Sequence, residues 1–162
     1  MKAVKIIFLS FLATTLAVAG TLDDAPFKVV LTNTHWKLDD SNAQDLSKGV
    51  FLVASIINPN TQSKSVIIKT VLEKPSATSL DELAAGIEDQ FSNPIVKKLS
   101  DEPATFLGYK ARHFVYLVNG ASYNEAVVFV SGNKGWTIAV SGLLKQKVEI
   151  QELLSFYKNK TN

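Results

Sequence analysis

Glycine, lysine and serine gather in one stretch of the sequence, FVSGNKGWTIAVSG at residues 129–142. Such residues build loops that hold phosphates, but a Walker loop needs the order G-x-x-x-x-G-K-S/T and leads from a strand into a helix. Here the lysine precedes the second glycine, and Trp136 begins an apolar, β-branched run. The stretch therefore predicts a β-hairpin with its turn within residues 132–135, its lysine at the solvated tip and Ser131 opposite Trp136.

The two histidines, His35 and His113, are the next candidates for chemistry. Structural zinc sites usually take four Cys or His ligands, and the chain has no cysteine, so a zinc site is not expected. No G-x-S-x-G elbow accompanies either histidine. His113 shares a predicted strand face with Val115 and Leu117, which indicates a partly buried, hydrogen-bonded side chain. His35 stands beside Trp36 and is a candidate for lining a pocket or a partner surface.

Acidic residues recur in pairs, and adjacent carboxylates are ligands for hard cations. The most oxygen-rich stretch is Asp39–Asp45. It fails as an EF-hand loop because Gln44 takes the glycine position and Val50 the position of the bidentate glutamate. We expect a solvated loop here, no metal site and no cofactor.

The N-terminus carries the three-part pattern of a secretory signal peptide. Lys2 and Lys5 precede an apolar run over residues 6–18, and Ala17-Val18-Ala19 is a small-x-small cleavage signal. The run is shorter than the roughly 20 residues of a membrane-spanning helix. The sequence therefore predicts a signal peptide over residues 1–19 and a single domain over residues 20–162, periplasmic or secreted, with no stable membrane anchor after cleavage.

Net charge and cysteine content limit the kinds of partner and anchor that the protein can have. The formal net charge of +2 comes from the two leader lysines, so the mature domain is neutral. A nucleic-acid-binding protein would carry a clustered basic face, so we expect no nucleic-acid partner. Without cysteine the chain can form neither a disulfide nor an acylated-cysteine anchor, so its stability must come from its core.

Hydrophobic patterning predicts the elements that would position these side chains. Short apolar runs bounded by turn residues favour strands, and several are joined as hairpins by turn signals such as Asn119-Gly120. We expect strands at 27–31, 50–57, 65–73, 111–118, 123–131 and 136–141.

Two amphipathic helices complete the pattern. Ser79-Leu80-Asp81-Glu82 reads as a capping box for a helix that runs to Phe91 with one apolar face. A second helix is expected over residues 147–158. Strands in hairpins predict an α+β protein with a mainly antiparallel sheet flanked by these helices.

The order of these features resembles the PsbP-like superfamily, which includes the photosystem II extrinsic protein PsbP and DcrB-like exported bacterial proteins. The likeness spans residues 27–158 and rests on five features: the FKVV strand at Phe27 followed by Trp36, the SLDELAAGIEDQF helix, the LGYKA segment at Leu107–Ala111, the GWTIAVSG strand at Gly135–Gly142, and the terminal helix with Leu154-Ser155-Phe156. The resemblance implies an α/β/α sandwich and an accessory or adaptor role without catalysis. It supplies no catalytic residues, and a photosystem role is not carried over.

The leading hypothesis is thus an exported, non-enzymatic binding or assembly-accessory protein of the bacterial envelope, with a protein partner or small ligand there. The alternatives are a small-molecule or lipid carrier with a pocket between sheet and helices, and a hydrolase that uses His35 or His113. Aromatic side chains bury large areas at contact surfaces, and we expect exposed aromatics to mark one. The candidate surface residues are His35, Trp36, Tyr109, His113 and Tyr116.

Overall fold

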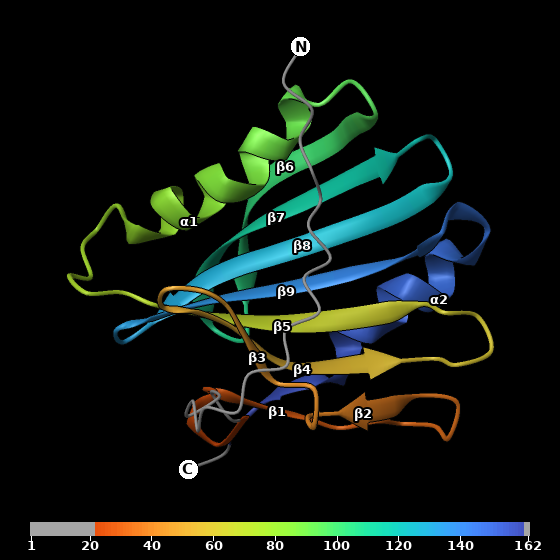
Figure 1. Ribbon diagram of the computed structural model, residues 1–162, viewed down its shortest axis with the longest axis horizontal. Helices are drawn as coiled ribbons and strands as arrows, with labels where there is room; N and C mark the ends of the chain where they lie inside the picture. Colours follow the sequence, from red (N-terminus) through yellow and green to blue (C-terminus); the bar gives the residue numbers. More distant parts are fainter. Residues whose placement is uncertain (1–21, 161–162) are drawn as a thin grey trace.

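The computed structural model describes residues 22–160, so the predicted signal peptide lies outside the described residues. The fold is α+β, with a large antiparallel sheet between two helices (Figure 1), which confirms the predicted class. The sheet has eight strands in the order β2-β4-β5-β9-β8-β7-β6, with β3 paired to β4. A separate two-stranded sheet joins β1 to β10 and so brings the two ends of the described chain together.

Hairpins join β3 to β4, β4 to β5, and β6 through β9 in chain order, whereas β5 and β6 are joined through a helix and β5 pairs with β9. Their bounds are β1 Phe27–Val29, β2 Lys37–Asp39, β3 Gln44–Ser47, β4 Val50–Ile57, β5 Lys64–Val71, β6 Val96–Phe106, β7 Tyr109–Val118, β8 Ser122–Ser131, β9 Lys134–Leu143 and β10 Tyr157–Asn159. The helices are α1 Ser79–Glu88 and α2 Lys147–Glu152, with 3-10 turns at Leu22–Asp24, Asp89–Ser92, Leu144–Gln146 and Leu153–Phe156. Within residues 22–160, neither helix combines the length and hydropathy that a bilayer crossing requires.

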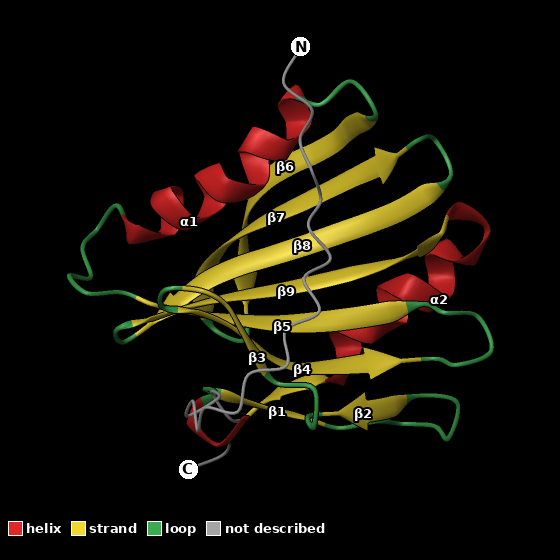
Figure 2. Cartoon of the chain, in the orientation of Figure 1, coloured by secondary structure: helices red, strands yellow, loops and turns green. Residues whose placement is uncertain are grey.

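The two helices cover opposite faces of the sheet (Figure 2). Strand side chains alternate between faces, so Val127 and Phe129 of β8 point toward α2, and Ala126 and Val128 point toward α1. The core on the α2 side is the larger and is rich in aromatic rings, which include Phe27, Trp136 and Tyr157. Phe27 meets both other rings edge-on, with centroids 5.3 and 5.4 Å away.

The glycine-rich stretch forms the predicted hairpin, but its register differs from the prediction by two residues. The turn is Gly132-Asn133, with Gly132 at φ +61°, and Ser131 pairs with Lys134 rather than with Trp136. A shift of two keeps every side chain on its predicted face. Lys134 is not a solvated tip, because its ammonium bonds the Asp24 carboxylate at 3.0 Å.

Glycines beyond the turn have a packing role. Gly135 lies in β9, and a Cβ there would clash with Leu83 of α1. Gly142 lies at the other end of β9 on the opposite face, where a Cβ would stand 2.8 Å from Ile150 Cδ1 of α2. Each helix therefore packs directly on the backbone of β9.

Helix α1 begins where predicted, but the capping box is wrong. Ser79 is the first helical residue, and its hydroxyl accepts a hydrogen bond from the backbone N–H of Ser76 at 2.8 Å. Thr78 precedes the helix and donates its hydroxyl to Glu82 at 2.8 Å. The predicted apolar face does pack on the sheet through Leu80, Leu83, Ala84, Ile87 and Phe91.

Three other segments differ from the sequence-based expectation. Residues 96–106 form the long edge strand β6, which the sequence did not reveal. The polar stretch after Trp36 contains the short strands β2 and β3 rather than loop alone. The predicted terminal helix is shorter, since Tyr157 leaves it to pair with Val29 as part of β10.

Candidate functional site

A polar cluster lies on the α2-facing side of the sheet and is built by His113, Tyr123, Glu125 and Gln151. Residues 123 and 125 are two apart on β8 and share a face. His113 on β7 pairs with Val127, which makes Glu125 its diagonal neighbour. Helix α2 crosses above and adds the amide of Gln151.

The hydrogen bonds of the cluster converge on the Glu125 carboxylate. His113 Nε2 lies 2.7 Å from Oε2, and the Tyr123 hydroxyl donates to Oε1 at 2.5 Å. The Gln151 amide in turn donates to the Tyr123 oxygen at 3.2 Å. Glu125 is only 3% exposed and Tyr123 2% exposed, whereas a third of the His113 side chain remains open to solvent.

Burial and hydrogen bonding act in opposite directions on the Glu125 carboxyl. Burial alone would raise its pKa, but the hydrogen bonds from His113 and Tyr123 and the nearby imidazole charge outweigh it and lower the pKa. The pKa of the Tyr123 hydroxyl is strongly raised, first by burial and then by the adjacent carboxylate. The cluster therefore holds an ionised glutamate beside a phenol that stays protonated.

The arrangement does not favour nucleophilic attack by the Tyr123 hydroxyl. A protonated, buried phenol is a poor nucleophile. Along residues 22–160, the hydrogen-bond partner of His113 is a carboxylate rather than a serine or threonine hydroxyl. Over the same residues, no group of three metal-ligating side chains is placed to hold an ion.

The structure places the predicted site residues in different surroundings. His113 is partly buried and hydrogen-bonded, as predicted. His35 is exposed and precedes β2, which is separated from β7 by four strands of the sheet, so the two histidines do not form one site. Tyr109 is partly buried and stacks on Phe129, with ring centroids 5.3 Å apart.

The expectation that Trp36 and Tyr116 are exposed is wrong. Trp36 is 4% exposed and packs edge-on against Phe156, with centroids 5.7 Å apart. Tyr116 is 9% exposed and lies on the α1-facing side of the sheet, where its ring packs against Phe91. Both rings are core contacts: Trp36 lies just before β2 and packs against Phe156, and Tyr116 lies in β7 and packs against Phe91.

Sequence reasoning missed Tyr123, Glu125 and Gln151. A usable signal exists in the segment SYNEAVVFVS, where Glu125 is the one acidic residue of an otherwise largely apolar strand. An acidic side chain on the buried face of a strand needs a partner, and His113 is the basic group within reach.

A shallow polar depression lies at the end of the sheet where β4 turns into β5. It measures about 460 Å³ and is open to solvent, and its lining is Asn60, Thr61, Gln62, Ser122, Ser141, Gly142 and Leu143. The predicted site residues do not line it.

No protein-family model matches this sequence, and no curated protein matches it either. Solved structures do show the same architecture. Cyanobacterial PsbP (CyanoP) from Synechocystis superposes with a TM-score of 0.61 at 14% identity, over 93% of this chain and 99% of that protein. LpqN, which is involved in cell envelope biogenesis of Mycobacterium tuberculosis, superposes with a TM-score of 0.57 at 13% identity, over 88% and 89%. The protein described here therefore has a PsbP-like fold, as the order of its sequence features predicted.

Proposed function

We propose that this protein is an exported, non-catalytic binding or assembly-accessory protein of the bacterial cell envelope. The observation that carries the proposal is the state of the polar cluster. Its carboxylate and phenol are almost fully buried and bonded to each other, so neither is presented to a substrate. His113 keeps some solvent access, but its Nε2 faces Glu125.

The envelope part of the proposal has separate support. LpqN, whose fold this chain shares, acts in cell envelope biogenesis, and the predicted leader over residues 1–19 would deliver the chain there. Fold and role are separate properties, so the envelope location is tested independently of the fold.

A carrier with a pocket between sheet and helix is less well supported. Aromatic rings fill the α2-facing side of the sheet, where Phe27, Trp136 and Phe129 are fully buried and the Phe27 ring contacts both of the others. Ligand pockets are concave and enclose most of their ligand. The open polar depression beside Leu143 encloses too little to act as such a pocket.

Complementation of a deletion strain tests the absence of catalysis. The variants His113→Asn and Glu125→Gln keep the size of each side chain and remove its proton-transfer chemistry. We expect both to restore the envelope phenotype of the deletion to the level of the wild type, provided that circular dichroism confirms folding. Loss of complementation by a folded, normally abundant variant would contradict the proposal and favour the hydrolase.

A further inference from the structure

Exposed apolar side chains gather at one end of the sheet, where β6 begins and β9 leads into α2. Ile95 is 48% exposed, Leu143 47%, Leu144 40% and Val148 83%, and we call these four residues the apolar rim. Two backbone hydrogen bonds order them along the end of the sheet. Asn119 donates to Ile95, and Leu144 donates to Ala121 in the turn that follows Asn119.

Helix geometry explains why Val148 faces outward. Ile150, two residues further along α2, is fully buried against β9. Positions two apart on a helix point in nearly opposite directions, so burial of Ile150 turns Val148 into solvent. Leu144 precedes α2 in the 3-10 turn Leu144–Gln146 and is 40% exposed.

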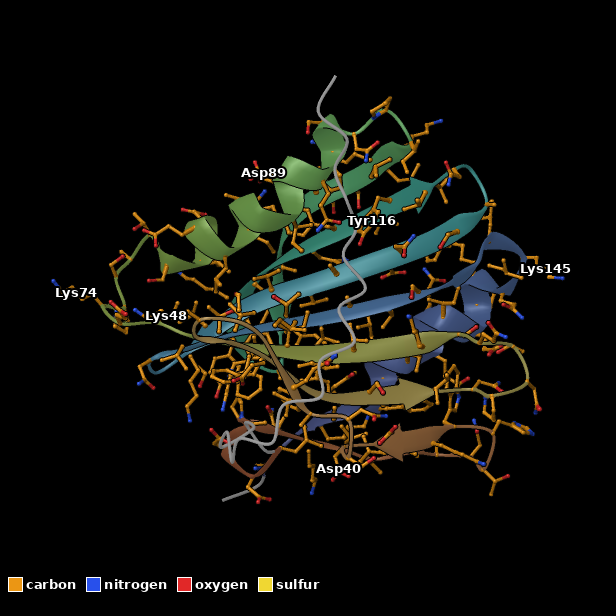
Figure 3. All side chains as sticks on the ribbon, viewed as in Figure 1. Asp40, Lys48, Lys74, Asp89, Tyr116 and Lys145 are labelled. Atoms are coloured by element: carbon orange, nitrogen blue, oxygen red, sulfur yellow. The ribbon has the colours of Figure 1, made fainter. Side chains whose placement is uncertain are left out.

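Lysines border the apolar rim. Lys97 and Lys145 are exposed and lie within two residues of a rim side chain, whereas the Lys147 ammonium lies over the Tyr123 ring, 5.2 Å from its centroid. Figure 3 shows Lys145 at the extremity of the molecule, at the opposite end from Lys48 and Lys74. The nearby acidic side chain of Glu149 points toward the β4–β5 turn instead. There it accepts hydrogen bonds from Asn58 and Thr61 at 3.0 and 2.5 Å. The outer surface is thus apolar with a basic border.

We propose that the apolar rim docks this protein on the surface of an anionic lipid bilayer. Protruding leucine and valine side chains beside exposed lysines match the two parts of such a surface, the acyl boundary and the negative headgroups. The rim residues lie in the turn before β6, at the end of β9, in the 3-10 turn that follows it and in the short helix α2. A flat bilayer surface can contact such an exposed rim directly. The inference rests on the proposed function in one respect, since the envelope location brings the bilayer within reach.

The absence of cysteine allows a direct test. The variant Val148→Cys, labelled with a fluorophore that reports polarity, is mixed with vesicles of equal parts phosphatidylglycerol and phosphatidylcholine. Every variant is made in the same full chain, processed as it is in the cell. Any vesicle binding by the N-terminal segment is therefore the same in each variant. Leu46→Cys in β3 is the matched control, because Leu46 is also an exposed apolar residue but lies away from the rim.

We expect the label at position 148 to shift to the blue on anionic vesicles and the label at position 46 to stay in water. Lys145→Glu should weaken the apparent vesicle affinity of the position 148 label about tenfold, since one lysine near an anionic surface contributes about fivefold and its reversal adds repulsion. Lys74→Glu, at the opposite end, should leave the affinity unchanged. Added salt should weaken binding in the same direction as Lys145→Glu.

Three outcomes would overturn the inference. The label at position 148 could stay in water on anionic vesicles, or respond equally to pure phosphatidylcholine, or shift with protein concentration when no vesicle is present. The last would assign the rim to contact between copies of the chain. None of these outcomes bears on whether the protein is exported to the envelope or acts as an enzyme. Failure of the inference would therefore leave the proposed function intact.

Discussion

Glu125 is a carboxylate held ionised in an almost fully buried position by His113 and Tyr123. Its pKa is lowered in the folded protein, so below about pH 4.5 the unfolded chain binds more protons at this site than the folded one. The stabilisation is therefore complete above that pH and is lost as the pH falls through the lowered folded value.

Glu125→Gln should make the free energy of unfolding less sensitive to acid. We expect a cost of about 1–3 kcal/mol at neutral pH, because His113 loses a charged partner. The difference in unfolding free energy between the variant and the wild type should then decrease as the pH falls below 4.5. Urea unfolding on both sides of that pH measures both effects. A gap that stays constant with pH would mean that Glu125 is not ionised in the fold.

Trp136 offers a second test at the residue scale. Its indole N–H is buried and has no hydrogen-bond acceptor among the described residues, while its ring packs edge-on against Phe27. An unsatisfied buried donor costs about 1–3 kcal/mol. Trp136→Phe removes that donor and keeps an aromatic ring, so we expect it to change stability by less than about 1.5 kcal/mol.

The matched comparison is Trp136→Ala, which leaves a cavity and should cost about 3–5 kcal/mol. Thermal or urea unfolding of the two variants separates the contributions of ring and N–H. If Trp136→Phe costs as much as Trp136→Ala, the N–H has a partner, such as a buried water, that stabilises the fold.

Residue identity alone could not locate the site. His113 was predicted to be partly buried because its strand neighbours are apolar, and the structure confirms that. The exposure of Trp36 and Tyr116 could not be predicted, since an aromatic residue looks the same in the sequence whether another element covers it or not. Only packing against Phe156 and Phe91 determines their burial.

At the scale of elements, β9 is the strand on which both helices depend. Gly135 meets Leu83 of α1, so Gly135→Ala forces the helix away from the sheet. We expect a loss of about 1–3 kcal/mol in unfolding free energy, the usual cost of overpacking. Gly86→Ala is the matched control, because Gly86 lies inside α1 with open space around it and alanine there should stabilise by about 0.5–1 kcal/mol.

A double variant tests the mechanism of that loss. Leu83→Ala removes the side chain that the new methyl group would meet, so Gly135→Ala should cost much less in that background. Losses that simply add in the double variant would show that the glycine is needed for another reason.

The sequence predicts the elements that have strong hydrophobic periodicity, but it does not predict the edge strand β6. The strands β4, β5, β7, β8 and β9 and the apolar face of α1 follow their sequence patterns, because each buries a regular set of side chains. The edge strand β6 has one neighbour and carries charges and Pro103, so it has no apolar alternation to detect. The hairpin register was two residues off because alternate registers separated by two keep the same faces.

At the scale of the whole molecule, the two ends of the described chain close the core. β1 and β10 pair beside the sheet, and Asp24 binds both Lys69 and Lys134 at 3.1 and 3.0 Å. Burial would raise the pKa of Asp24, but the hydrogen bonds from these lysines lower it overall. The α2-facing core is thus closed by aromatic rings and by the ion pairs of Asp24.

We infer that the protein works by binding a partner in the bacterial envelope. Proximity labelling in the native cell tests it most directly, with a labelling enzyme fused to the C-terminus and the same enzyme exported alone as control. The account predicts that envelope proteins are reproducibly enriched over that control. A labelled set of cytoplasmic proteins, or one that does not differ from the control, would contradict it.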